Sequence, residues 1–153
     1  MAVGHSAGGQ LALWALARGG FDSDAPGADP VVGLIGAVSQ AGVLDLIEAA
    51  ESGLGGSAVA DLMRSEPAAE PERYQTASPI EQLPLGRPVT LVHGTGDSIV
   101  PIDQSERYAE AAETAGDEVE FVRLDGVDHM ALIDPSSAAW ETCRTETLRL
   151  LGR

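Results

Sequence analysis

The chain has 153 residues, 44% of them hydrophobic, and a formal net charge of -15. This length and apolar content are typical of one folded domain with its own core and exclude a disordered chain. All nine basic residues are arginine. So acidic a surface repels nucleic acid and anionic membranes, and we expect neither as a partner.

Several kinds of site are excluded by what the sequence lacks. No run approaches the roughly 18 apolar residues of a membrane-spanning helix. No Cys/His cluster suggests metal ligands, and no phosphate-binding glycine loop is followed by a ribose-binding acid, so we expect neither a metal nor a cofactor. The single cysteine, Cys143, is expected to be a small buried residue of a helix. No signal peptide is visible, and we expect a cytoplasmic protein.

The first motif of the chain is Gly-x-Ser-x-Gly at residues 4–8, centred on Ser6. This is the pattern of a nucleophile elbow, in which a serine stands on a sharp turn between a strand and a helix. The residues two before and two after the serine are pressed together there, which favours glycine at both places. The alternative is a glycine-rich helix start with a serine cap. Strong helix formers over 10–18 predict the helix, whereas only residues 1–3 remain for the strand.

Strand and helix patterns alternate along the rest of the chain. Continuous apolar runs over 31–39 and 88–93 predict strands that are buried on both faces of a parallel sheet. Residues 118–124 alternate between polar and apolar, as an edge-side strand does. Helices are predicted over 102–115 and 136–151. The fold class is therefore α/β, with a mostly parallel sheet flanked by helices.

Residues 47–85 form the least regular stretch, rich in Gly, Ser and Pro, with a short helical pattern over 58–64. We interpret it as a mobile cap or insertion over the sheet edge. Its larger apolar side chains are candidates for a substrate pocket, and ordinary packing is the alternative for each of them. These side chains are Leu54, Val59, Leu62, Met63 and Tyr74.

Three chemically complementary residues each follow a predicted strand: Ser6, Asp97 and His129. The carboxyl ends of parallel strands meet at one edge of a sheet, so we expect the three side chains to lie close together. Free serine is a poor nucleophile. A histidine must take its proton, and a carboxylate must hold that histidine in the right tautomer. His129 is then the base and Asp97 the orienting acid.

Each assignment has a competitor. Asp97 could instead be a turn residue, because Gly-Asp-Ser is good turn chemistry. Asp125 and Asp128 are rival acids, but both lie too close in sequence to the proposed base to approach its ring from a separate strand end. His93 lies inside a predicted strand and is expected to be a packed structural residue. His5 is expected to pack beside the elbow.

The three motifs together resemble the C-terminal half of an α/β-hydrolase fold. The branches that the chain is similar to are the esterases, the kynurenine-formamidase-like proteins and the prolyl-oligopeptidase-like proteins. The resemblance is carried by the elbow and its run on to Trp14, by Val-His-Gly-x-x-Asp-x-x-Val-Pro at 92–101, and by Gly-Val-Asp-His at 126–129. It implies an ester, amide or peptide substrate, and it gives Ser6, Asp97 and His129 the roles above.

The resemblance also implies that the backbone N–H of Ala7 forms part of an oxyanion hole. Members of the superfamily carry further strands and a His-Gly-Gly type loop before the elbow, which this sequence lacks. We therefore expect a single, N-terminally shortened domain over 1–153 with an exposed sheet edge. Such an edge can pair with another chain, for example as a homo-oligomer. Loss of one oxyanion donor typically costs on the order of 100-fold to 1000-fold in turnover.

The leading hypothesis is a serine hydrolase that cleaves small-molecule esters or amides through an acyl-enzyme on Ser6. One alternative is a non-catalytic half-domain that associates through its exposed edge. Another is a serine peptidase of the prolyl-oligopeptidase-like branch. Replacement of Ser6 by alanine separates the first two, since it abolishes hydrolysis and leaves association unchanged.

Overall fold

The computed structural model describes residues 1–152 and holds one parallel sheet of four strands in the order β1-β2-β3-β4. The predicted α/β class is confirmed. The strand bounds are β1 (Ala2–His5), β2 (Ala37–Gln40), β3 (Val89–Gly94) and β4 (Val119–Leu124). All three neighbouring pairs are parallel, so the carboxyl ends of the four strands lie at the same edge of the sheet.

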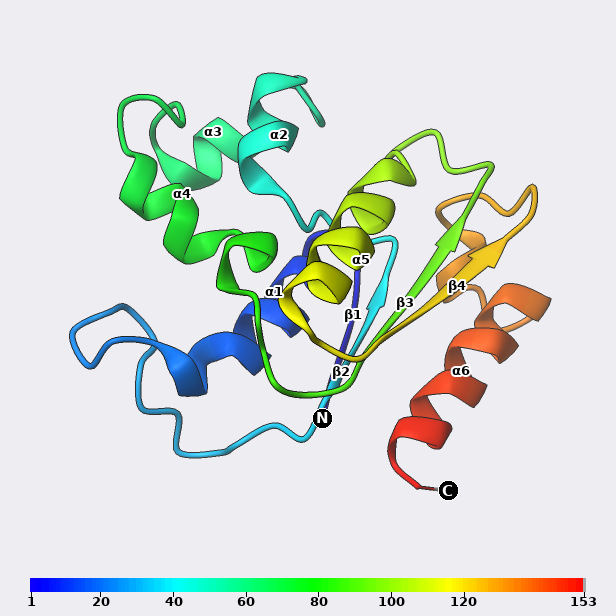
Figure 1. The fold of residues 1–153 in the computed structure, drawn as a ribbon. Coiled ribbons are helices and arrows are strands. Elements are labelled where there is room, and N and C mark those ends of the chain that lie inside the picture. Colours follow the sequence, from blue (N-terminus) through cyan, green and yellow to red (C-terminus); the bar gives the residue numbers. More distant parts are fainter. Residues whose placement is uncertain (153) are drawn as a thin grey trace.

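Three longer helices cover the two faces of this sheet (Figure 1). Helices α1 (Ala7–Ala17) and α5 (Asp103–Ala115) lie on one face, and α6 (Ala138–Leu150) lies on the other. Successive strand residues point to opposite faces, which divides the core in two. The first cluster joins Leu13 and Tyr108 to Leu91, and the second joins Cys143 to Val92.

The stretch between β2 and β3 folds into three short helices, α2 (Leu46–Glu51), α3 (Ala58–Met63) and α4 (Pro71–Ala77). Figure 1 shows them grouped toward the end of the sheet to which the strands point. They share a buried cluster of their own, formed by Leu46, Ala49, Val59, Met63 and Tyr74. Single turns of 3-10 helix complete the chain: η1 (Arg18–Gly20), η2 (Pro79–Gln82) and η3 (Ala131–Ile133).

One predicted strand is wrong over most of its length. The apolar run over 31–39 was expected to be buried, yet β2 begins only at Ala37, and Val31 and Val32 are exposed. The register explains this difference, because Ala37 pairs with Ala2 of β1 and with Val89 of β3, where both neighbours begin. The residues before Ala37 therefore have no strand on either side to bury them.

The other predicted elements lie within a few residues of their observed bounds. Helix α5 ends at Gly116, whose φ of 86° is the left-handed conformation that glycine adopts without strain. Strand β1 is longer than the three residues expected and pairs with β2 along its whole length.

At the outer side of β1, Val3 is 46% exposed and, within residues 1–152, no strand pairs there. The part of the chain that the structure describes has no helix both long enough and apolar enough to cross a membrane.

Candidate active site

Ser6 stands at the turn between β1 and α1 and has a strained backbone, with φ 57° and ψ -123°. Positive φ is unusual for a residue with a side chain and costs about 1–3 kcal/mol. The surrounding structure fixes it, since the N–H of Ser6 donates to the carbonyl oxygen of Gln40 at 2.8 Å. The sequence motif therefore does form a sharp strand-to-helix turn.

The glycines around the turn differ in how strictly they are needed. A Cβ on Gly4 would lie 1.9 Å from the carbonyl oxygen of Gly8, so only glycine fits at residue 4. A Cβ on Gly8 would meet nothing within 4 Å, which corrects the expectation that both glycines of the motif are sterically required. The second strict position is Gly9, whose Cβ would lie 2.6 Å from Ser39 Oγ.

The N–H of Ala7 lies at the first residue of α1, directly after Ser6. The first N–H groups of a helix have no intrahelical partner and carry partial positive charge. Within residues 1–152 no hydrogen bond from this N–H to another group is present. It is therefore available to donate to a negatively charged oxygen of a bound molecule.

Asp97 and His129 form a close pair at the carboxyl ends of β3 and β4. His129 Nδ1 lies 2.6 Å from Asp97 Oδ2, and the Asp97 side chain is fully buried. Asp97 Oδ1 accepts the N–H groups of Ile99 and Val100 at 2.8 and 2.9 Å. Because a carboxylate only accepts, Nδ1 of His129 carries the proton, and its Nε2 is left to accept one.

Two opposing effects act on the pKa of Asp97. Burial alone raises it, but the hydrogen bonds from His129, Val100 and Ile99 together bring it below its ordinary value. Asp97 is therefore ionised at neutral pH, although it is buried. An ionised partner is what holds a histidine ring in one tautomer and stabilises its protonated form.

Close backbone contact brings the two loops of this pair together. A Cβ on Gly94 would lie 2.0 Å from the carbonyl oxygen of Val127, and the N–H of Gly96 donates to that same oxygen at 3.1 Å. The rival carboxylates have other roles. Asp125 accepts the hydroxyl of Thr95, and Asp128 accepts the N–H groups of the two residues that follow His129.

All three histidines of the chain gather at this site. His93 is completely buried in β3, as expected, and its Nε2 lies 3.0 Å from the carbonyl oxygen of Val100 and 3.3 Å from Asp97 Oδ2. Its Nδ1 lies 2.8 Å from the Ser105 hydroxyl. Burial lowers the pKa of His93, with smaller opposing contributions from Val100 and Asp97. A neutral His93 thus donates its Nε2 proton to the Val100 carbonyl, with Asp97 Oδ2 close beside it, and the sequence reasoning missed this proximity to Asp97.

His5 provides the link between the elbow and the histidine loop. Its Nε2 lies 2.9 Å from the backbone oxygen of His129, and the two imidazole rings are 4.2 Å apart. Within residues 1–152 no hydrogen bond joins the Ser6 hydroxyl to the His129 ring. The structure therefore places Asp97 against His129, and places His129 beside the residue that precedes Ser6.

A small cavity opens beside Ser6 with a volume of about 210 Å³. Three of the five predicted pocket residues line it, namely Leu54, Val59 and Leu62. Met63 lines a neighbouring cavity, and Tyr74 lines neither; Tyr74 is fully buried and donates its hydroxyl to the Ser65 carbonyl. The remaining lining residues are Ser6, Ala7, Gln10, Val43, Leu46, Gly55, Ala58, Ile99 and Val100, so no charged side chain faces the cavity.

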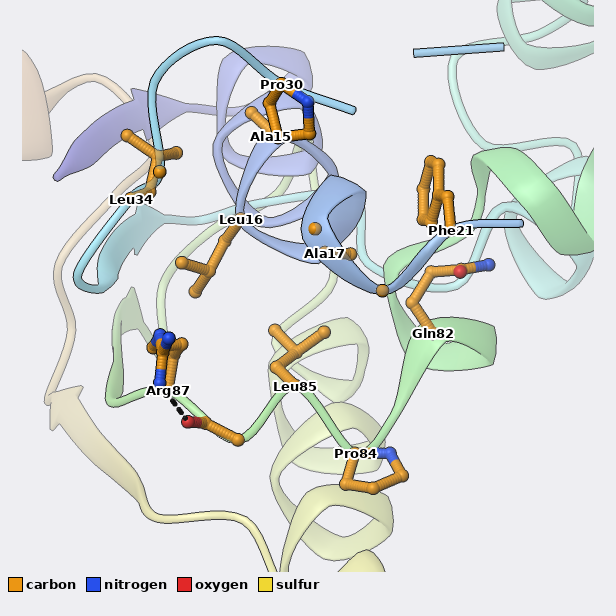
Figure 2. A pocket seen from close by; sticks show the side chains of 14 residues that line it. Ala15, Leu16, Ala17, Phe21, Pro30, Leu34, Gln82, Pro84, Leu85 and Arg87 are labelled. Atoms are coloured by element: carbon orange, nitrogen blue, oxygen red, sulfur yellow. Dashed lines mark hydrogen bonds between the residues drawn. The ribbon is translucent and has the colours of Figure 1, made fainter. Parts of the chain in front are cut away.

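A larger cavity of about 430 Å³ lies at the opposite edge of the sheet. Figure 2 shows Leu16, Leu34, Leu85 and Arg87 around it, and Arg87 donates to the carbonyl oxygen of Gly86. The segments that line it lead into the amino ends of β2 and β3, and none of the predicted catalytic residues reaches it. Active groups of parallel sheets collect at the carboxyl ends, so the smaller cavity is the candidate site.

Two observations concern metal binding and cysteine chemistry. Among residues 1–152, no group of three or more His, Cys, Asp and Glu side chains is arranged to hold a metal ion. Cys143 is buried in α6, and burial raises the pKa of its thiol, which is the opposite of what a reactive cysteine needs.

A parallel sheet with helices on both faces and a strained serine between β1 and α1 define an α/β-hydrolase fold, as predicted. The model of the family described as BD-FAE matches residues 1–111, and the chain belongs to this family. The matched part includes Ser6 and Asp97 and ends before His129.

Solved structures and a curated sequence extend the comparison. An acylaminoacyl peptidase in complex with Z-Gly-Gly-Phe-chloromethyl ketone matches 99% of this chain and 23% of its own, with TM-score 0.74 and 22% identity. The acetyl ester-xyloside bifunctional hydrolase from Caldicellulosiruptor lactoaceticus matches 98% of this chain and 56% of its own, with TM-score 0.72 and 25% identity. The non-reducing polyketide synthase pkbA of Emericella nidulans is 30% identical over 90 residues, which are 56% of this chain and 4% of that protein. The chain thus spans little more than half of the C. lactoaceticus hydrolase and much less of the other two.

Proposed function

We propose that the chain carries the catalytic centre of a serine hydrolase that cleaves carboxylic ester or amide bonds of small molecules. The observation that carries the proposal is the 2.6 Å hydrogen bond between His129 Nδ1 and Asp97 Oδ2, next to the strained turn at Ser6. Membership of the BD-FAE family and the 25% identity to an acetyl ester-xyloside hydrolase support hydrolysis of this type.

The reaction runs in two halves through an acyl-enzyme. Ser6 Oγ attacks the substrate carbonyl carbon while its proton passes to His129 Nε2, and Asp97 stabilises the imidazolium that forms. The N–H of Ala7 donates to the developing oxyanion. Collapse of the tetrahedral intermediate expels the alcohol or amine, which takes the proton from His129. Water, deprotonated by His129, then attacks the acyl carbon, and the second tetrahedral intermediate expels Ser6 Oγ, which takes the proton back from His129 as the acid is released.

The cavity beside Ser6 suits a short, uncharged acyl group. Its volume is about 210 Å³, and a water molecule occupies about 30 Å³ in the liquid. The cavity therefore has room for about seven groups of that size. Leu54, Val59 and Leu62 present apolar atoms to it, and an acyl chain with its own charge would lose its hydration there without a partner.

The two alternatives from the sequence have weaker support. The likeness to an acylaminoacyl peptidase is at 22% identity and shows the fold alone, so it does not favour a peptide substrate. Association through the outer side of β1 is supported by Val3, which is exposed there, and by the absence of a paired strand on that side within residues 1–152. It does not explain the pair formed by Asp97 and His129, and the two activities are compatible.

The test is hydrolysis of p-nitrophenyl acetate, butyrate and octanoate by this chain and by Ser6→Ala. We expect acetate and butyrate to be cleaved and octanoate to be cleaved poorly, with all turnover lost in Ser6→Ala. Equal turnover in the wild type and in Ser6→Ala would refute the proposal. Turnover that depends on Ser6 but favours octanoate would refute only the assignment of the acyl cavity.

A further inference from the structure

We propose that His5 is a positioning residue for the reaction proposed above, because its imidazole holds the backbone carbonyl of His129 and so fixes where the base stands relative to Ser6. The inference rests on the proposed function. The sequence alone suggested only that His5 packs beside the elbow.

The hydrogen bond partner of His5 determines which nitrogen of its ring carries the proton. Its Nε2 lies 2.9 Å from the His129 backbone oxygen, which can only accept a hydrogen bond. The proton is therefore assigned to Nε2 of His5 from the identity of its partner. The bond spans 124 positions in the sequence and connects the end of β1 to the loop that follows β4.

The loop that carries His129 is held to the rest of the fold at a residue before His129 and at a residue after it. On the near side, the N–H of Gly96 donates to the carbonyl oxygen of Val127 at 3.1 Å. On the far side, Gln40 Nε2 donates to the carbonyl oxygen of Leu132 at 3.0 Å. Between these two anchors, Asp128 accepts the N–H groups of Met130 and Ala131 from within the loop, and His5 binds the backbone oxygen of His129 from β1.

Two independent contacts thus determine the position of the base. Asp97 holds Nδ1 of the His129 ring, which sets how the ring is turned. His5 holds the backbone from which that side chain starts, which sets how far the ring lies from the elbow. Since His5 is the residue directly before Ser6, a shift of one loop relative to the other would strain this bond. Misplacement by about 1 Å can cost about 100-fold in rate.

His5 must also stay neutral while the base works. The His129 ring becomes positively charged when it takes the proton of Ser6, and its centroid is 4.2 Å from that of His5. The titratable groups that act on His5 are His129 and Asp97. Burial lowers the pKa of His5, the bond to the His129 carbonyl and the charge of Asp97 raise it, and the charge of His129 lowers it, with a lowered net value. A neutral His5 at neutral pH follows.

Two substitutions distinguish the role of the His5 hydrogen bond from that of simple packing by its ring. His5→Phe keeps a ring against His129 and removes the donor, whereas His5→Gln keeps an amide donor at a similar reach. Val3→Ala, on the same strand but with a side chain that is 46% exposed, controls for general weakening of β1. His5→Asn, whose donor is too short to reach, replaces His5→Phe if that variant does not fold.

The experiment measures the acylation rate with p-nitrophenyl acetate, the split between kcat and KM, and melting for each variant. We expect His5→Phe to lower kcat about tenfold, the size of one lost hydrogen bond, with KM unchanged. His5→Gln should stay within about threefold of the wild type. As the pH falls below the ordinary histidine value of 6.5, the wild type should lose activity that His5→Gln retains, because only the wild type can place a positive charge on the ring at residue 5.

Failure of this inference differs from failure of the proposed function. If the wild type is active and Ser6→Ala is inert, but His5→Phe acylates as fast as the wild type, His5 has no positioning role. If the wild type is inactive, NMR of the histidine rings decides. We then expect the His129 ring signals to move in His5→Phe and to be retained in His5→Gln, and unchanged signals in both would overturn the inference.

Discussion

Replacement of Asp97 by asparagine exchanges one oxygen for an NH2 group at the centre of the site. The remaining oxygen can still accept the N–H groups of Ile99 and Val100. The new NH2 group then faces Nδ1 of His129 and Nε2 of His93, both of which carry protons in the wild type. A donor that faces donors drives His129 into the other tautomer, in which Nε2 is protonated and cannot take the proton of Ser6.

The size of the effect follows from this change of tautomer. The equivalent substitution in a Ser-His-Asp triad lowers kcat about 10⁴-fold, which is about 5.5 kcal/mol of transition-state stabilisation. The fold should lose much less. Loss of one charge-assisted hydrogen bond costs about 2 kcal/mol, and in a domain of this size that lowers Tm by about 4–8 °C. We therefore expect Asp97→Asn to be folded and almost inactive.

The assay is hydrolysis of p-nitrophenyl acetate together with a thermal melt, and Asp128→Asn is the matched control. Asp128 lies in the same loop and accepts only the N–H groups of Met130 and Ala131, which an asparagine oxygen can also accept. We expect this control to keep its activity. Asp97→Asn with wild-type turnover, or an equal loss in both variants, would refute the assignment of Asp97 as the orienting acid.

Three further changes test separate parts of the structure. Gly4→Ala should unfold the chain or make it insoluble, because its Cβ would lie 1.9 Å from the Gly8 oxygen, whereas Gly8→Ala should raise Tm by removing a helical glycine. Val59→Phe should fill the cavity beside Ser6 and lower hydrolysis of butyrate at least tenfold relative to acetate in a comparison of kcat/KM. His93→Gln should flatten the pH dependence of stability in urea unfolding between pH 7.5 and 5, because burial holds the pKa of His93 below its ordinary 6.5. The free energy that a neutral buried His93 contributes is fully present above the unfolded pKa and is lost as pH falls toward the folded one.

Each of these three predictions would be contradicted by one particular result. Equal melting of Gly4→Ala and Gly8→Ala would contradict the close approach in the turn. An unchanged ratio of butyrate to acetate hydrolysis in Val59→Phe would place the acyl group elsewhere. If the free energy of unfolding of the wild type rises relative to that of His93→Gln as the pH falls, His93 is not held neutral in the folded protein.

The contact between Asp97 and His129 could be predicted, because it depends only on the topology of the sheet. Once strands alternate with helices, parallel pairing brings the ends of β3 and β4 side by side, and Asp97 meets His129. The sharp turn at Ser6 was likewise visible in the spacing of the glycines, although Gly9 rather than Gly8 proved to be the second strict position.

What could not be predicted depends on register and on side-chain direction. The apolar run before Ala37 carries the pattern of a buried strand, but its exposure is decided by where β1 and β3 begin. The contact of His5 with His129 spans 124 positions and leaves no periodic signal. The four-residue spacing of His93 and Asp97 is the one local hint of their contact.

The most direct test of the central claim is intact-mass analysis of the purified chain after reaction with a fluorophosphonate, with Ser6→Ala in parallel. Such reagents modify a serine only when a neighbouring base activates it, so the adduct reports the assembled group of Ser6, His129 and Asp97. We expect one adduct on the wild type and none on Ser6→Ala. A folded wild type that takes no label, or an adduct that persists in Ser6→Ala, would contradict the account.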